Sequence, residues 1–257
     1  MRHVGPLDPT TNTQPLQQWH GTALVVGCGG IGTALLEALA ERAAGLSLAG
    51  ASRRGRSTGL PPGCRAVALD LTQDASLTAL PDALAGLPPL RLVINTAGLL
   101  HDGALQPEKR LARISRSALE RSFAVNAFGP VLLAQALDPL LQREQPMHFA
   151  SLSARVASIG DNRLGGWYAY RAAKAAQNQL LRTLAIEWQR RFPLACVSLL
   201  HPGTTATPLS EPYQATVPAG KLFSPARAAA QLLDVIEGLT PAHTGLFWAW
   251  DGKPIPW

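Results

Sequence analysis

Two residues of one predicted helix, Tyr170 and Lys174, carry groups that could transfer a proton. Residues four apart lie on the same face of a helix, so the phenol and the ammonium can reach one small volume. A phenol with a pKa of about 10 is a poor acid or base at neutral pH, but a nearby cation favours the phenolate. The pair therefore suits general acid–base catalysis. Tyr168 lacks such a partner, because Lys174 lies six positions further along the chain.

The spacing alone is weak evidence, because many helices carry a half-buried tyrosine beside a solvated lysine. Three further motifs raise its weight. They are a glycine-rich turn near residue 27, the tetrapeptide Asn95-Thr96-Ala97-Gly98, and His201-Pro202-Gly203 after the helix.

The glycine-rich turn lies between a predicted strand and a predicted helix. The apolar run from Thr22 to Val26 leads directly into it, and a helical pattern of leucines follows. In this context backbone N–H groups and a helix N-terminus bind a pyrophosphate. We therefore predict that the turn contacts a dinucleotide through Gly27, Gly29, Gly30, Ile31 and Gly32.

A second predicted strand, Leu46 to Gly50, runs toward Ser52, Arg53 and Arg54. A site that prefers NAD places an acidic residue at this point, and no carboxylate stands there. Two guanidinium groups suit the 2′-phosphate of NADP(H), which is the cofactor that we expect. A basic loop without a ligand is the alternative.

In these motifs and their order, the sequence from Thr22 onward resembles the short-chain dehydrogenase/reductase family. The family's glycine turn is usually one residue longer, so the path of the turn is left open. Gly165-Gly166-Trp167-Tyr168 and the segment after Thr244 resemble the C-factor-like branch of the family. That branch is similar to the sniffer type of carbonyl reductase.

The resemblance implies further cofactor contacts at the ends of the third, fourth and sixth predicted strands, and at Lys174 of the predicted helix. For Asp70 the alternative is structural: Asp70 or Thr72 could be the N-cap of a helix from Gln73 to Leu84, which would explain the acidic residue equally well. The implied contacts are Asp70, Leu71, Asn95, Ala97, Gly98, Lys174, Pro202, Gly203, Thr204 and Thr207.

The resemblance also implies the catalytic roles. Tyr170 would donate the proton, and Lys174 would lower its pKa and hold the nicotinamide ribose. Asn126, in a helix that we expect to open at Ser117 and to kink at Pro130, would support the proton path.

The sequence differs from the family at the serine whose hydroxyl the family directs at the substrate carbonyl. Ala154 occupies its usual place. The hydroxyl could come from Ser153 or Ser158, and we prefer Ser153 because it lies at the end of the fifth predicted strand.

The 257 residues, 47% of them hydrophobic, can fill one core. We expect one α/β domain over residues 21–257, with a Rossmann fold: a doubly wound parallel sheet of about seven strands. Residues 1–20 are expected to be a disordered tail, because Met1 to Gln18 has no apolar core.

Charge and composition limit the kinds of partner that we expect. The net charge of +6 comes from scattered basic residues without an aromatic-interleaved stripe, so we expect no nucleic acid. The longest uncharged run, Ser122 to Leu137, is too short to span a bilayer, and the tail is no signal peptide. Scattered cysteines and histidines predict a reducing compartment and no metal site. We therefore expect a cytoplasmic protein.

These observations favour an NADP(H)-dependent carbonyl reductase acting on a small ketone, aldehyde or alcohol. Leu209 to Phe223 would form a lid over the substrate. The family commonly forms dimers or tetramers through the helices that hold Asn126 and Tyr170. The alternative is a C-factor-like signalling or scaffold protein that binds the cofactor with little or no turnover.

Overall fold

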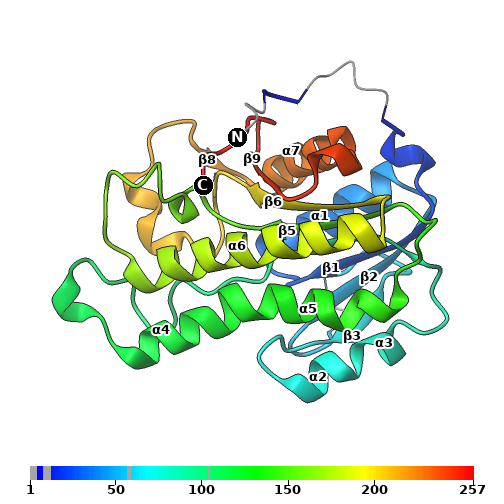
Figure 1. The fold of residues 1–257 in the computed structure, drawn as a ribbon. Helices are drawn as coiled ribbons and strands as arrows, with labels where there is room; N and C mark the ends of the chain where they lie inside the picture. Colours follow the sequence, from blue (N-terminus) through cyan, green and yellow to red (C-terminus); the bar gives the residue numbers. More distant parts are fainter. Residues whose placement is uncertain (1–4, 8–12, 57–58, 104) are drawn as a thin grey trace.

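The computed structural model describes residues 5–7, 13–56, 59–103 and 105–257. Its centre is a parallel sheet of seven strands in the order β3-β2-β1-β4-β5-β6-β9 (Figure 1). The order reverses between β1 and β4, which confirms the predicted doubly wound sheet. The strands are β1 (Gly21–Val26), β2 (Leu46–Ser52), β3 (Arg65–Ala68), β4 (Leu90–Asn95), β5 (Met147–Leu152), β6 (Ala195–His201) and β9 (Leu246–Ala249).

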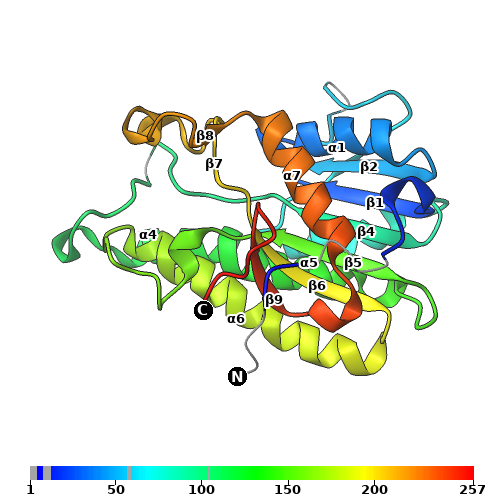
Figure 2. The ribbon, with the colours of Figure 1, turned by 90° about the horizontal axis from the view of Figure 1, so that it is seen from above.

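The strands are apolar because helices cover both faces of the sheet. Side chains alternate along β1: Leu24 and Val26 join one core cluster, and Ala23 and Val25 join the other. The helices α1 (Gly30–Arg42) and α7 (Pro225–Gly238) cover one face (Figure 2). The other face carries α2 (Asp74–Thr78), α3 (Leu80–Ala83), α5 (Gly129–Leu137) and α6 (Tyr168–Arg191), while α4 (Arg116–Phe123) packs on α6.

Smaller elements connect these layers. A two-stranded sheet pairs β7 (Thr204–Thr205) with β8 (Leu222–Phe223). Short 3-10 helices lie at Leu16–Gln18, Leu111–Arg113, Asp138–Leu140, Arg155–Ala157, Glu211–Thr216 and Pro241–His243.

Two predicted helices differ from the structure. The helix expected from Gln73 to Leu84 is divided into α2 and α3, with Pro81 in the first turn of α3, where its missing N–H does no harm. The helix expected to open at Ser117 begins at Arg116, because the Ser115 side chain accepts a hydrogen bond from the Ala118 N–H (3.1 Å).

The predicted kink at Pro130 is a π-helical segment, Ala124–Phe128, that lies just before it. Pro130 has no N–H to donate to the carbonyl of Asn126 four residues earlier, which favours a wider turn there. Single π turns inside helices frequently mark functional positions.

Part of the expected N-terminal tail is packed on the domain. Leu16 and Trp19 are buried in the core beside α7, and the Leu16 N–H donates to Glu237 Oε1 (3.0 Å). The expectation of disorder is therefore wrong for residues 13–20, where two isolated apolar side chains anchor a polar segment. Residues 1–4 and 8–12 of the tail lie outside the described residues.

The uncharged run from Ser122 to Leu137 belongs to a longer helical run, Arg116–Leu140, with a mean hydropathy of 1.2. By length and composition this run could cross a membrane. Its α5 portion packs against α2, α3 and α6, and Leu133, Ala134 and Leu137 are buried in the core under the sheet. Core helices of globular domains pass the same test of hydropathy.

Candidate active site

The helix α6 brings Tyr170 and Lys174 to the carboxyl edge of the sheet. Its N-cap, Trp167, has a left-handed backbone (φ 52°), which is strained for a residue other than glycine. Glu108 holds this end of the helix: its carboxylate accepts a hydrogen bond from the Ala169 N–H (3.1 Å), and its carbonyl accepts one from the Trp167 N–H. A carboxylate at a helix N-terminus also interacts favourably with the helix dipole.

Tyr170 and Lys174 lie on one face of α6, as their spacing predicts. The Lys174 Nζ lies 6.0 Å from the centroid of the Tyr170 ring. Tyr170 is 9% exposed, and Lys174 is 3% exposed. Burial raises the pKa of Tyr170, so the phenol is a neutral proton donor.

The expected lowering of the tyrosine pKa is therefore not what this structure shows. Burial also acts on the cation, and it lowers the pKa of Lys174 to about 7. A lysine that is only partly charged at neutral pH favours the phenolate less than a full cation does. Desolvation by burial is the cause of both shifts.

Lys174 is held by a buried hydrogen-bond network that sequence reasoning missed. Its Nζ donates to the Leu152 carbonyl (2.8 Å) and to Gln177 Oε1 (2.8 Å). The Gln177 amide donates to Ser151 Oγ (2.9 Å), which also accepts a hydrogen bond from Asn95 Nδ2 (3.0 Å). Gln177, Ser151 and Asn95 are fully buried. The network therefore ties the lysine to the ends of β4 and β5.

Asn126 lies in the π-helical segment and binds the loop after β4. Its Oδ1 accepts from the Leu99 N–H (2.9 Å), and its Nδ2 donates to the Leu99 carbonyl (2.7 Å) and to Ser122 Oγ (3.2 Å). Gly98 lies between Asn126 and Lys174: a Cβ there would be 3.5 Å from Asn126 Oδ1 and 3.9 Å from Lys174 Nζ. The structure thus brings both predicted residues to one loop.

The serines differ in how their hydroxyl groups are used. Ser153 donates to Asn178 Oδ1 (2.7 Å) and is buried. Ser158 Oγ accepts from the Asp161 N–H (3.1 Å), also in a buried place. Ala154, at the family's usual serine position, is half-exposed. Neither serine presents a free, exposed hydroxyl.

The glycine turn has a defined path. Gly27 has a positive φ (93°), and the Gly29 N–H donates back to its carbonyl (2.7 Å). A Cβ on Gly32 would lie 2.1 Å from the Gly27 carbonyl oxygen, so no other residue fits there. Thr96 closes the turn from β4, because its hydroxyl lies 2.6 Å from the Gly27 carbonyl oxygen.

This turn fits the pyrophosphate of a dinucleotide. The helix α1 begins at Gly30, and its N-cap, Gly29, offers no side chain to the first N–H groups. A Cβ on Gly29 would meet nothing within 4 Å. Unpaired N–H groups beside open space at a helix N-terminus bind phosphate groups. Ile31, the remaining predicted residue of the turn, lies in the first turn of α1 and packs partly on the core.

The predicted 2′-phosphate residues follow β2. Ser52 ends that strand, and Arg53 and Arg54 are exposed in the turn after it. Asp70 accepts hydrogen bonds from the Thr72 N–H (2.9 Å) and hydroxyl (2.7 Å), which hold the pKa of its carboxyl below its usual value, with a smaller contribution from Arg53. The cap of α2 is Gln73, so neither Asp70 nor Thr72 serves as the N-cap.

The remaining predicted contacts lie on three segments. The Leu71 side chain is buried, so only its backbone could face a ligand. Thr207 lies over the glycine turn, since a Cβ on Gly30 would be 2.8 Å from its methyl group. The other predicted residues are found at the carboxyl edge: Asn95, Ala97 and Gly98 at the end of β4, and Pro202, Gly203 and Thr204 at the end of β6.

Aromatic side chains join the segment after residue 207 to the start of α6. The ring of Trp167 lies 6.2 Å from that of Tyr170 and 4.9 Å from that of Tyr213. His101 Nε2 is 3.1 Å from the Leu209 carbonyl oxygen, and its ring lies 6.2 Å from Tyr213. The sequence predicted a lid in this segment, which stays a prediction, and the contacts among these three rings were missed.

The comparisons with known proteins bear on the family and the fold. A family model described as short chain dehydrogenase matches residues 21–218. The C-signal of Myxococcus xanthus is 32% identical over 170 residues, which cover 66% of this chain and 93% of that protein. These matches and the expected C-factor-like resemblance point the same way.

Two solved structures share the fold. An NADPH-bound carbonyl reductase from chicken fatty liver superimposes with a TM-score of 0.79 at 23% identity, covering 93% of this chain and 99% of that one. The carbonyl reductase Sniffer of Drosophila melanogaster gives a TM-score of 0.76 at 22% identity, covering 93% and 100%. At these identities the likeness establishes the fold alone.

Proposed function

Because the chain belongs to the short-chain dehydrogenase family, and so is an oxidoreductase by descent, we propose that it is an NADP(H)-dependent carbonyl reductase. The observation that carries this proposal is the placement of Lys174 between the Tyr170 ring and Gly98, at the same sheet edge as the glycine turn. Ligands of open parallel sheets bind at this edge. The substrate would be a small ketone or aldehyde, or the corresponding alcohol.

In the proposed reaction the bound nicotinamide supplies the hydride, and the protein handles the proton. Tyr170, neutral because it is buried, donates its proton to the oxygen that gains charge. Lys174, fixed by the Leu152 carbonyl and Gln177, lies next to the tyrosine ring and offers a cation as the phenolate forms. Asn126 keeps the loop of Gly98 and Leu99 in register with both groups.

The choice of NADP(H) over NAD(H) rests on Arg53 and Arg54. Both are exposed after β2, where a 2′-phosphate would lie, and guanidinium groups bind phosphate through two parallel hydrogen bonds. The chicken carbonyl reductase that shares this fold is described as NADPH-bound, which supports the choice.

A second function is favoured by one observation. The hydroxyl of Ser153, the predicted donor to the substrate carbonyl, is already bound to Asn178, and Ala154 offers no hydroxyl. A chain with a cofactor site but without this donor suits a signalling or scaffold protein, and the relative from Myxococcus xanthus is named C-signal.

The test separates cofactor binding from turnover. NADPH oxidation is followed by absorbance against a panel of small ketones and aldehydes, while NADPH and NADH binding are measured by fluorescence. The reductase proposal expects binding with turnover and tighter binding of NADPH. Binding without turnover of any substrate supports the signalling alternative, and no binding contradicts both.

We further propose a cytoplasmic protein that forms dimers or tetramers through α4, α5 and α6. Two large apolar side chains are well exposed here: Phe128 (49%), in the π-helical segment between α4 and α5, and Ile186 (43%), on α6. Sedimentation of the full chain tests the assembly.

A further inference from the structure

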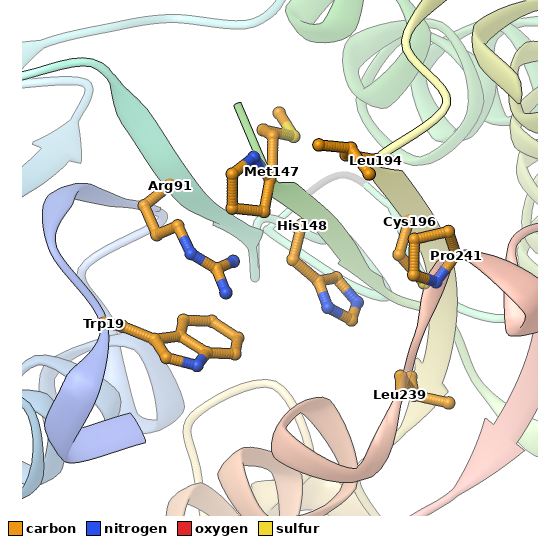
Figure 3. Close-up of a pocket in the computed structure, with 9 residues that line it drawn as sticks. Trp19, Arg91, Met147, His148, Leu194, Cys196, Leu239 and Pro241 are labelled. Carbon is orange, nitrogen blue, oxygen red and sulfur yellow. The ribbon is translucent and has the colours of Figure 1, made fainter. Parts of the chain in front are cut away.

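A cavity of about 170 Å³ lies at the amino edge of the sheet, opposite the candidate active site (Figure 3). Arg91 is the second residue of β4, and Met147 and His148 begin β5. The five steps from Met147 to Leu152 at the other edge span about 16 Å. The cavity is also lined by Trp19, which precedes β1, by Cys196 in β6 and by the segment after α7.

Arg91 brings an uncompensated cation to this cavity. Its guanidinium lies 3.6 Å from the centroid of the Trp19 ring, and the contact helps to hold a half-buried charge. Within the part of the chain that the structure describes, its guanidinium makes no hydrogen bond and no ion pair. Burial lowers the pKa of Arg91 only to about 10, so the side chain stays charged at neutral pH. Its N–H groups are thus available to an anion.

The other polar side chain of the cavity is neutral. His148 Nε2 lies 2.8 Å from Ser198 Oγ, and burial, with Arg91 nearby, lowers the pKa of His148 to about 3. Cys196 is also neutral, because burial raises the pKa of its thiol to about 12. Among the described residues, no Asp or Glu side chain lines the cavity, so no carboxylate of these walls repels an anion.

The remaining walls are apolar. They consist of Pro146, Met147, Leu194, Leu239 and Pro241. An engineered apolar cavity of about 150 Å³ accepts benzene, so this cavity has room for one ring or a short branched chain. A ligand here would have a single negative charge at one end and a small apolar body.

We infer that this cavity binds a small organic monocarboxylate, with its carboxylate on the Arg91 guanidinium and its apolar body against Met147, Leu194 and Leu239. Arginine pairs with carboxylates through two parallel hydrogen bonds, and the Trp19 ring holds the guanidinium plane in place. The site is separate from the cofactor turn, so it does not depend on the proposed function.

The test is calorimetric titration of the full chain with sodium benzoate, benzamide and benzylamine. Benzoate should bind with a Kd below about 10 mM, which is the affinity expected of an efficient ligand of its size. Benzamide and benzylamine should bind at least tenfold more weakly. Equal binding of benzamide overturns the assignment of an anion site, and no binding of benzoate overturns the site.

Two variants locate the site. Arg91→Met keeps an unbranched apolar stem at this position and removes the guanidinium, so benzoate affinity should fall about tenfold or more. Leu194→Trp, at a position that is 43% exposed, should fill the mouth of the cavity and abolish binding without touching the charge. If Arg91→Met does not fold, Leu194→Trp decides alone. Unchanged benzoate binding in a folded variant of either kind overturns the inference.

Discussion

The hydroxyl of Tyr170 is the group on which the proposed reaction depends. Tyr170→Phe removes only this hydroxyl, so turnover should fall by about 10²-fold or more while NADPH affinity stays near that of the wild type. Steady-state kinetics and NADPH fluorescence measure the two effects.

Tyr168 is the matched control, since it lies on the same helix and is 39% exposed. Tyr168→Phe should leave the rate nearly unchanged. Near-normal activity of Tyr170→Phe would remove the tyrosine from the mechanism.

Gln177 is predicted to position Lys174 rather than to touch the substrate. Gln177→Leu removes the acceptor at 2.8 Å from Nζ, which should lower the lysine pKa further, shift the pH–rate profile to lower pH and reduce kcat by about tenfold. Gln177→Glu should shift the profile the other way, because a carboxylate favours the charged lysine.

Gln179, exposed on the same helix, supplies the control for Gln177. Gln179→Leu should leave the pH–rate profile where it is. If the profiles of both Gln177 variants also match the wild type, the glutamine has only a structural role.

The place of Ala154 makes the serine question testable. Ala154→Ser restores a hydroxyl at a half-exposed position and should raise kcat/KM by about tenfold, since a donor at a developing oxyanion contributes about that much or more. Ser153→Ala should have a small effect, because its proton is held by Asn178. Steady-state kinetics of both variants, with Ser158→Ala as the reference, shows which position can serve the substrate carbonyl.

A loss of about a hundredfold in Ser153→Ala would instead restore the sequence-based assignment of this serine. Its hydroxyl would then have to leave Asn178 when substrate binds.

The turn after β2 is the element that should select the cofactor. Replacing Arg53 and Arg54 together with alanine should weaken NADPH by at least tenfold and leave NADH nearly unchanged, because only NADPH carries the 2′-phosphate. Arg113→Ala with Arg116→Ala removes the same charge from another exposed segment and controls for net charge. Fluorescence titration with both cofactors measures the result; equal losses would exclude a 2′-phosphate site here.

Elements whose signals are local could be predicted from the sequence. The glycine turn follows an apolar strand, and the start of α7 is given by Ser224, whose side chain accepts from the Arg227 N–H, followed by Pro225. The spacing of Tyr170 and Lys174 likewise needs only one helix. In each case the cause lies within a few neighbouring residues.

Features that depend on packing could not be predicted. In the sequence nothing distinguishes Gln177 from other polar residues of a helix. Only the fold buries it between Lys174 and Ser151. The lowered pKa of Lys174 arises from desolvation, which no spacing reveals. Leu16 and Trp19 look like part of a polar tail until α7 is placed beside them.

The stability of the whole molecule should fall in acid because of His148. Its pKa is about 3 in the folded protein and about 6.5 when unfolded, so between these values the unfolded chain binds the extra proton. The free energy of unfolding should therefore decrease as the pH falls below about 6.5, by at most about 1.4 kcal/mol per pH unit from this residue. Urea unfolding from pH 7 to pH 4 measures the slope.

His148→Gln keeps a polar partner for Ser198 and cannot titrate, so its slope should be smaller. His20→Gln, at an exposed position, should keep the slope of the wild type. If the His148 and His20 variants show the same slope, acid sensitivity arises elsewhere.

The reversal of strand order between β1 and β4 also bears on the synthesis of the chain. The strand β1 pairs with β2 on one side, but its other edge waits for β4, which begins only at Leu90. While the ribosome makes the residues between them, an apolar strand, Ala23 to Val26, has one open edge. Open edges of this kind pair with other chains. The nascent chain should therefore expose an edge of β1 that can pair with other chains, and that a chaperone could cover, until residue 95 has left the ribosome.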